Sequence, residues 1–547
     1  MFIVEYLKLS GSNLKIIFFG LCSGIIASYY NVYVNEFTGL IIQGDFSNEC
    51  LYNLYYTSLL AIIFTSLRGA LFTYSQKNMN TNIRILIYKK LLFKPSTFYE
   101  TTPISTLHEY INNDVNIVSN IISLNMNVFM RSTINIIITL YLLYNISFKL
   151  CILVVFIIGF NLIISFLYNK YYKYLMKDFE DNNKKLHIFI NETISHILML
   201  KTFAVEDLAI IKHSHLSKNV SYFFIYESYL YAINAFIIFN MPVITMIIII
   251  LYAKYFNLTT GLISFILHYK SLFTTVNELL EVKNELTKCF TPYDRIMKLL
   301  NEDLTTSGYY IPNNNQLVPL ITFENIEFQY KKALKPIIQN FNFTIQPYDK
   351  IAIIGSSGCG KSTIVKLLVG ILANTNGTIF INNIDINHYN NKWLKNKIGY
   401  VAQETILFTD TIANNIAYGL DNYDYNDIKK AAIMANADEF IDKLDNKYET
   451  IIEGTEMSSL SGGQKQRISI ARALIRKPQI IIFDEATSAL DPYCEEVVQQ
   501  TIKNCFKTQN ATMIVIAHHK SAFEMVNTIY KLENSELSIF DNQNKNK

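Results

Sequence analysis

Six long apolar runs in the first half of the sequence constrain the fold more than any other feature. Each approaches the ~20 residues that an α-helix needs to cross ~30 Å of hydrocarbon. The runs occupy residues 14–34, 54–72, 128–146, 150–168, 231–252 and 258–276. Charged residues make up only 17% of the chain, which agrees with a large part of it lying in a membrane. We therefore predict an all-α domain of six transmembrane helices over residues 1–300.

The segments between these runs predict a topology. The two long ones, 73–127 and 169–230, carry many basic residues, whereas the short connections contain only Lys149 and Lys254. The positive-inside bias places the long segments, the N-terminus and everything after the sixth run on the cytosolic side, or its equivalent such as a mitochondrial matrix. The long segments contain little proline, so we expect the helices to extend beyond the membrane as arms of roughly 37 Å.

Charge and cysteine content argue against other classes of protein. The 48 Lys plus Arg against 45 Asp plus Glu leave a net charge of +3, without the basic excess of a dedicated nucleic-acid binder. We expect no nucleic-acid partner. The seven cysteines are scattered and contain no CxxC pair, so they indicate neither a disulfide framework nor a zinc site. The first 15 residues lack the pattern of a presequence or a cleaved signal peptide, and we expect no removable targeting segment.

A second domain follows a polar segment that contains both Pro and Gly, residues 301–319, which predicts a linker. Beyond it, alternating strands and apolar strands that end at Gly or Asp are separated by helical stretches. This pattern predicts an α/β domain with a mainly parallel sheet over residues 320–541, followed by a polar tail at 542–547.

Residues 355–363 read GSSGCGKST, directly after an apolar strand and before a helix. They match the phosphate-binding loop GxxxxGK[ST], whose backbone N–H groups surround phosphates. In this loop Lys361 would contact the β- and γ-phosphates, and the Ser362 hydroxyl would ligate Mg²⁺. The predicted nucleotide-binding residues of the loop are Gly355, Ser356, Ser357, Gly358, Cys359, Gly360, Lys361, Ser362 and Thr363.

The segment IIIFDE at residues 480–485 is an apolar strand that ends in two carboxylates. Following a phosphate-binding loop, this pattern indicates the hydrolytic half of a P-loop ATPase site. Asp484 would hold Mg²⁺ through water, and Glu485 would orient, or accept a proton from, the water that attacks the γ-phosphate.

LSGGQKQR at residues 460–467 completes a set of motifs, with the loop, IIIFDE, Gln403 in YVAQE, SALD at 488–491 and His518 in IAHH. Because all six motifs occur along the chain in the order that the family has, the chain resembles ATP-binding-cassette (ABC) transporters of the six-span exporter type over nearly its full length. The resemblance implies ATP hydrolysis coupled to transmembrane transport, with ATP and Mg²⁺ bound. It also implies a cassette domain that follows the membrane domain.

The same resemblance implies roles for further residues. In this family two cassettes pair head to tail, so the signature would meet the γ-phosphate held by a second copy of the chain or by a related half-transporter. Tyr330 would stack on adenine, Gln403 would touch Mg²⁺ or its water, and His518 would hydrogen-bond the γ-phosphate. The signature residues are Ser461, Gly462, Gly463 and Gln464.

The transported substrate is left open by the sequence. The segment at 407–419 is similar to mitochondrial exporters that serve iron–sulfur cluster assembly and carry thiol compounds such as glutathione conjugates. The thiol-binding stretch of that subgroup is absent from the sixth run. A lipid, peptide or multidrug exporter is the alternative, as is an ATP-gated channel or regulator. The membrane is either that of a reduced mitochondrion or another cellular membrane.

Polar residues within the runs are candidates for lining a substrate cavity. Hydrogen bonding between helices or snorkelling explains each of them at least as well. They are Arg68, Asn135, Asn161, Asn234, Asn240, His268 and Lys270.

Overall fold

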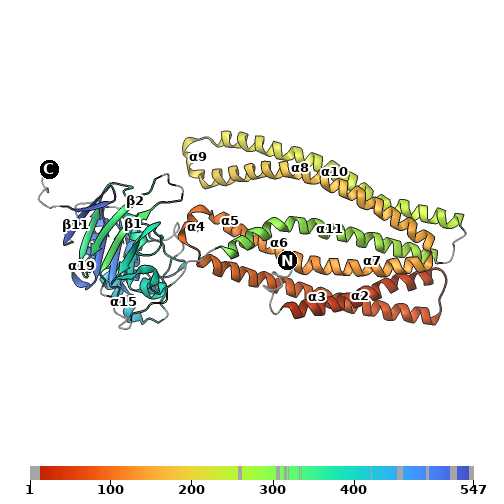
Figure 1. The fold of residues 1–547 in the computed structure, drawn as a ribbon, viewed down its shortest axis with the longest axis horizontal. Helices are drawn as coiled ribbons and strands as arrows, with labels where there is room; N and C mark the ends of the chain where they lie inside the picture. The colour runs from red at the N-terminus through yellow and green to blue at the C-terminus, as the bar shows by residue number, and fades with distance from the viewer. Residues whose placement is uncertain are drawn as a thin grey trace. The chain divides into compact units, whose positions relative to one another are not determined.

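The computed structural model divides the chain into two compact units (Figure 1). The first comprises Met1–Lys90 and Ser105–Glu302, and the second Leu91–Ile104 and Asp303–Lys547. The residues that it describes are 13–256, 261–302, 308–312, 317, 319–331, 333, 335–420, 422–452, 460–487, 492–517 and 526–540. The predicted linker lies partly outside these residues, and its limits stay a prediction.

The first unit is built from long helices, and the apolar runs lie within them except at the start of the sixth run. There residues 258–260 lie outside the described residues, and Gly261 precedes the helix that begins at Leu262. Those long helices are α2 (Asn13–Ile42), α3 (Asn48–Leu92), α7 (Met126–Ile146), α8 (Phe148–Ser195), α10 (Glu206–Tyr255) and α11 (Leu262–Asn301). Four helical stretches of the described chain are long and apolar enough to cross a membrane, and α10 adds a shorter apolar stretch at Asn240–Tyr255. The prediction of a helical transmembrane domain is confirmed.

Shorter elements connect these helices. Between α3 and α7 the chain forms α4 (Ser96–Thr101), α5 (Ile104–Glu109), α6 (Val115–Asn120) and two π-helical turns, Tyr110–Asp114 and Ile121–Asn125. Helix α9 (Ile197–Phe203) joins α8 to α10. Both α8 and α10 continue far beyond the apolar runs, as 48- and 50-residue helices.

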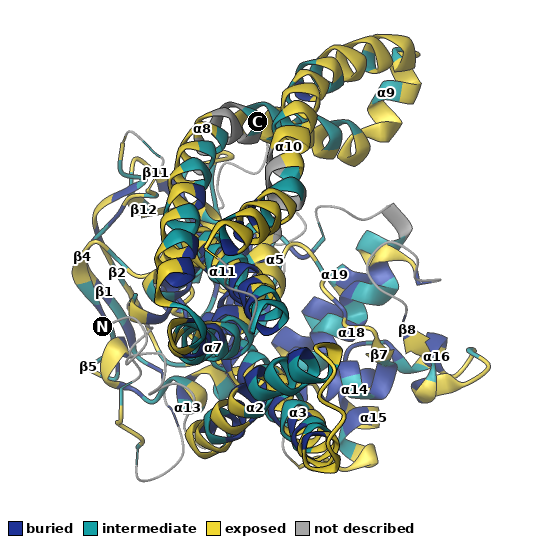
Figure 2. Cartoon of the chain, turned by 90° about the vertical axis from the view of Figure 1, so that its right-hand side faces the viewer, coloured by how far each residue is buried: buried dark blue, intermediate teal, exposed yellow. Residues whose placement is uncertain are grey.

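Small residues let the helices of the first unit approach closely. A Cβ atom at Gly20 of α2 would lie 2.9 Å from the Phe72 ring of α3, and one at Gly39 would lie 2.2 Å from Ser264 Oγ of α11. Such contacts are typical of helix packing in membranes, where lipid and side chains are equally apolar. Helices α8 and α10 lie side by side, and Figure 2 shows exposed residues along both of them.

The described residues of the second unit form three sheets. The six-stranded sheet has the order β12 (Glu536–Ile539), β11 (Thr528–Glu533), β3 (Lys350–Ile354), β10 (Thr512–Ile516), β9 (Ile480–Asp484), β6 (Ile398–Val401). All of its pairings are parallel except that between β11 and β12. The predicted α/β domain with a mainly parallel core sheet is therefore confirmed. A four-stranded antiparallel sheet has the order β2 (Ile338–Ile345), β1 (Ile321–Phe328), β4 (Asn376–Ile381), β5 (Ile384–Asp385), and β7 (Asp410–Thr411) pairs with β8 (Ile451–Ile452).

The central strands of the six-stranded sheet, β3, β10 and β9, are buried on both faces. In β9, Ile480 and Ile482 belong to the core that also contains Ile364 of α12 (Lys361–Leu368). Their neighbours in the strand, Ile481 and Phe483, belong to the core formed with α18 (Gly462–Leu474) and α19 (Pro492–Thr508). Because successive residues of a strand point to opposite faces, α12 and α18 cover opposite faces of this sheet. The remaining helices of this unit include α13 (Asn391–Asn396), α14 (Ile412–Ile416), α15 (Tyr425–Met434) and α16 (Asp438–Ile441).

Candidate functional site

The phosphate-binding loop lies between the end of β3 and the start of α12. Gly358 and Gly360 have φ angles of 81° and 106°, in the left-handed region that glycine adopts at little cost. The Lys361 amine donates to the carbonyl oxygens of Gly355 and Ser356, at 2.9 and 3.0 Å. Lys361 is buried, so its positive charge is held within the curve of the loop.

The end of β9 places Asp484 beside this loop. Ser362 Oγ donates to Asp484 Oδ1 at 2.8 Å, and the Tyr400 hydroxyl of β6 donates to Oδ2 at 2.9 Å. Burial and the neighbouring carboxylate raise the pKa of Tyr400, so Tyr400 remains a hydrogen-bond donor. The serine hydroxyl and the buried carboxylate are hard oxygen ligands of the kind that Mg²⁺ takes. The donor set therefore fits the predicted ion.

Glu485 follows Asp484 and has an unusual backbone conformation. Its φ angle is 47°, a left-handed value that residues other than glycine adopt mainly at functional or turn positions. Its backbone N–H donates to Ile516 O at 3.2 Å, and its carboxylate accepts a hydrogen bond from Gln403 Nε2 at 2.9 Å. Two predicted catalytic side chains are thus in direct contact.

Tyr330 lies next to the helix that follows the loop. Its hydroxyl is 3.3 Å from Thr363 Oγ1, and its ring packs edge-to-face on Phe328 at 4.8 Å between centroids. This half-buried ring lies near the start of α12, as a residue that contacts a bound nucleotide must. Its predicted stacking on adenine stays a prediction.

The signature residues begin helix α18 and form a capping box. Ser461 Oγ accepts from the backbone N–H of Gln464 at 3.3 Å, and Gln464 Oε1 accepts from the Ser461 N–H at 2.9 Å. Ser461 and Gly462 are exposed, whereas Gly463 is buried. A Cβ atom at Gly463 would lie 2.7 Å from Cys494 Cβ of α19. The exposed helix N-terminus is a suitable place for an anion.

Two other predicted motifs lie outside the described residues. They are His518 and the SALD segment at 488–491. Their predicted roles are carried forward as expectations.

Two residues of this site were not predicted from the sequence. Tyr400 was not singled out, although it lies three positions before Gln403. The second is Gln466, a buried residue of α18 whose Oε1 accepts from Thr405 Oγ1 and whose Nε2 donates to Ala402 O at 3.4 Å. These hydrogen bonds connect α18 to the loop that carries Gln403. The signal was present in LSGGQKQR, where Gln466 is an amide inside an apolar helix face.

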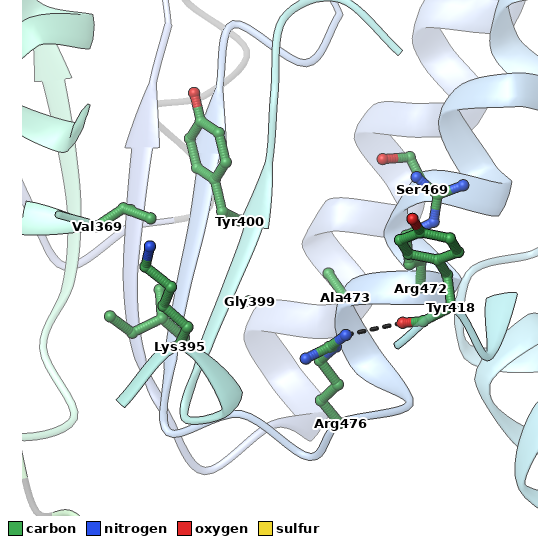
Figure 3. A pocket seen from close by; sticks show the side chains of 10 residues that line it. Val369, Lys395, Gly399, Tyr400, Tyr418, Ser469, Arg472, Ala473 and Arg476 are labelled. Carbon is green, nitrogen blue, oxygen red and sulfur yellow. Dashed lines mark hydrogen bonds between the residues drawn. The ribbon is translucent and has the colours of Figure 1, made fainter. Parts of the chain in front are cut away.

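A cavity of about 200 Å³ lies between β6 and α18 (Figure 3). Figure 3 shows Tyr400 and Lys395 on one side, with Arg472 and Tyr418 on the other. The arginines that line it are occupied by structural hydrogen bonds. Arg472 donates to Asn415 O and Ile406 O, each at 2.8 Å, and Arg476 donates to Tyr418 O at 2.7 Å. Of the two residues that donate to Asp484, Tyr400 lines this cavity and Ser362 does not.

Comparisons with known proteins show which families the two parts of the chain match. Residues 338–488 match the family model described as ABC transporter, and residues 14–279 match the model described as ABC transporter transmembrane region. The chain is 25% identical over 552 residues to antigen peptide transporter 2 of Rattus norvegicus, an alignment that covers 98% of this chain and 77% of the relative. It is 29% identical over 526 residues to the human ABC-type oligopeptide transporter ABCB9, covering 93% and 68%. With ABC transporter B family member 1 of Dictyostelium discoideum it shares 30% identity over 550 residues, covering 97% and 60%.

Proposed function

This chain belongs to the ABC transporters, as an ATP-hydrolysing exporter half-transporter with a multi-pass membrane region, and we propose that the substrate it exports is a peptide. The observation that carries this proposal is the extent of the similarity. Relatives named as peptide transporters align with 87 to 98% of the chain, across both units. The predicted thiol or iron–sulfur cargo has no counterpart in their names.

The arrangement of the site supports a hydrolytic mechanism. Lys361 and the loop N–H groups would hold the β- and γ-phosphates of ATP, and Ser362 and Asp484 would hold Mg²⁺. When bound, Mg²⁺ would neutralise charge that develops on the transferred phosphoryl group. Glu485 would accept a proton from the attacking water, while the hydrogen bond from Gln403 holds its carboxylate in place. His518 is proposed to hydrogen-bond the γ-phosphate.

A complete site requires a second cassette. The loop precedes α12 and the signature begins α18, and these helices cover opposite faces of one sheet. The exposed Ser461 and Gly462 therefore do not close the loop of their own cassette. We propose a head-to-tail dimer with a second copy or a related half-transporter, in which each loop faces the partner's signature. The excess of basic residues in the long segments favours the cytosolic side, or a matrix, for the cassettes.

Uptake measured in proteoliposomes would test the proposed substrate. ATP should drive accumulation of a fluorescent peptide in the lumen against its gradient, through those molecules whose cassettes face outward. Glu485→Gln should lower turnover by about 10²- to 10⁴-fold, the usual contribution of a general base. An ATP-gated channel would only let the peptide equilibrate. Accumulation of a glutathione conjugate or a fluorescent lipid, with none of the peptide, would refute peptide export.

A further inference from the structure

Gln466 of α18 is a buried amide that contacts the loop between β6 and β7 (residues 402–409), which we call the Gln403 loop. The residue is only 2% exposed. Its Oε1 accepts a hydrogen bond from Thr405 Oγ1, and its Nε2 donates to Ala402 O at 3.4 Å. Burying an amide is costly unless its polar atoms have partners. Both ends of the Gln466 amide are thus bound to the loop, on either side of Gln403.

Further contacts attach the second half of the Gln403 loop to the same helix. The side chain of Leu407 belongs to the core formed with α18 and α19. Arg472, further along α18, donates to Ile406 O at 2.8 Å. Because α18 holds the loop at several points, a displacement of this helix would carry the loop with it.

The Gln403 loop in turn reaches the carboxylate of Glu485. Gln403 Nε2 donates to Glu485 Oε2 at 2.9 Å. The Gln403 residue is exposed, so packing does not restrict its side chain, and the position of the loop backbone decides where its amide reaches. The backbone of Glu485 is held separately, by the hydrogen bond to Ile516 O. The orientation of the Glu485 carboxylate therefore depends on the loop that Gln466 holds.

Gln466 belongs to the signature segment, yet its side chain is directed into its own cassette. Ser461 and Gly462, at the start of α18, are exposed and are proposed to meet the partner's ATP. Gln466 instead contacts the loop that carries Gln403 of its own chain. One helix thus combines an end suited to the partner's nucleotide with a side chain that serves its own hydrolytic site.

We propose that Gln466 is a positioning residue for ATP hydrolysis in its own chain, and that it acts on Glu485 through Gln403. This inference rests on the proposed function, because it assumes the roles given there to Glu485 and Gln403. In the head-to-tail dimer, ATP held by the partner would contact the start of α18. Its binding would therefore be coupled to the alignment of the general base in the chain that contains this helix.

Gln466→Leu tests the proposal, because it removes both hydrogen bonds with little change in volume. The kcat of the full chain in nanodiscs should fall by about tenfold, as expected for the loss of one or two ordinary hydrogen bonds. The KM for ATP should stay within about twofold, because Lys361 and the phosphate-binding loop are untouched. In the Gln403→Ala background, Gln466→Leu should cause no further fall in kcat. A further tenfold fall would mean that Gln466 does not act through Gln403.

Two other variants separate positioning from loss of stability. Thr405→Val removes one of the two hydrogen bonds from the loop side, so it should slow hydrolysis less than Gln466→Leu. If Gln466→Leu does not fold, Thr405→Val takes its place in the comparison with Gln403→Ala. Thr501→Val is the matched control, because the buried Thr501 accepts from Asn436 Nδ2 at 2.9 Å within the same cassette. It should lower the melting temperature with kcat unchanged, and a fall in kcat equal to that of Gln466→Leu would overturn the proposal.

Mixed dimers show which chain Gln466 serves. A dimer of one Lys361→Ala chain and one Ser461→Asp chain would keep a single intact site, whose phosphate-binding loop and Glu485 belong to the Ser461→Asp chain. Gln466→Leu in that chain should lower kcat by about tenfold. The same substitution in the Lys361→Ala chain, which supplies the signature, should cost less. The reverse order would mean that Gln466 acts on the partner's ATP, and the proposal would be wrong.

The Gln403→Ala variant distinguishes failure of this inference from failure of the proposed function. If Gln403→Ala hydrolyses ATP slowly and Gln466→Leu hydrolyses it at the wild-type rate, the positioning role is wrong and the proposed mechanism stands. If Gln403→Ala hydrolyses ATP at the wild-type rate, the proposed role of Gln403 is wrong, and the positioning role that depends on it is wrong as well.

Discussion

Tyr400 and Ser362 donate to different oxygens of the Asp484 carboxylate. Tyr400→Phe keeps the ring in place but removes the donor to Oδ2. Because hydrogen bonds to charged groups contribute about 1.5–3 kcal/mol, we expect the Mg²⁺ concentration for half-maximal ATPase activity to rise by about tenfold or more. The measurement is ATPase rate against free Mg²⁺.

Tyr448→Phe provides a matched control for Tyr400→Phe. The Tyr448 hydroxyl donates to Asp438 Oδ1 at 2.7 Å, so the control also removes a hydrogen bond to a carboxylate in the same unit. It should lower the melting temperature without changing the Mg²⁺ dependence. If the two variants show the same Mg²⁺ dependence, Tyr400 does not position the metal ligand.

The residues around Asp484 also show how far the sequence predicts the site. Ser362 and Asp484 were linked in the sequence analysis, because both were expected to hold Mg²⁺. Tyr400 was missed because a tyrosine in a short strand resembles an ordinary partly buried residue. Its contact depends on the pairing of β6 with β9. That pairing joins segments far apart in the chain, and local patterns do not specify it.

At the scale of elements, the start of α18 depends on close packing against α19. In Gly463→Ala the new Cβ would lie 2.7 Å from Cys494 Cβ and 2.9 Å from Cys494 Sγ. Overpacking of this kind typically costs about 1–3 kcal/mol, so we expect a lower melting temperature and slower ATP hydrolysis. Nucleotide binding at the loop should persist, because α12 covers the other face of the sheet. Thermal unfolding, ATPase rate and nucleotide affinity distinguish these effects.

The double variant Gly463→Ala with Cys494→Gly tests the stated cause. Removing the Cys494 side chain leaves Cα as the nearest atom of that residue, at 3.6 Å, so hydrolysis should recover. The new glycine in α19 itself costs about 1 kcal/mol, which limits the recovery in stability. A double variant that hydrolyses ATP as slowly as Gly463→Ala would instead mean that Gly463 is needed for contact with the nucleotide.

The membrane elements were predictable in position but not in pairing. Apolar length and composition were enough to place the six long helices. They did not predict that α8 pairs with α10, because lipid and neighbouring helices present equally apolar surroundings. The grouping of residues 91–104 with the second unit was also beyond the sequence patterns, since α4 is short and has no buried residues among those described.

At the scale of the whole molecule, the head-to-tail dimer predicts which mixtures of variants are active. Lys361→Ala disables the loop, and Ser461→Asp places a negative charge where the γ-phosphate of the partner's ATP would bind. In a mixed dimer of these two chains, one site combines both defects and the other site is intact. We therefore expect mixed dimers, purified through two different tags, to hydrolyse ATP faster than either parent dimer.

The converse mixture separates this arrangement from a site completed within one chain. When a chain carrying both substitutions pairs with the wild type, each shared site receives one defect, so hydrolysis should be lost. A site completed within one chain would leave the wild-type partner active in this mixture and would leave the first mixture inactive. The two arrangements predict opposite outcomes for the same pair of ATPase measurements. These measurements therefore decide whether hydrolysis requires two chains, as the positions of α12 and α18 on opposite faces of the sheet imply.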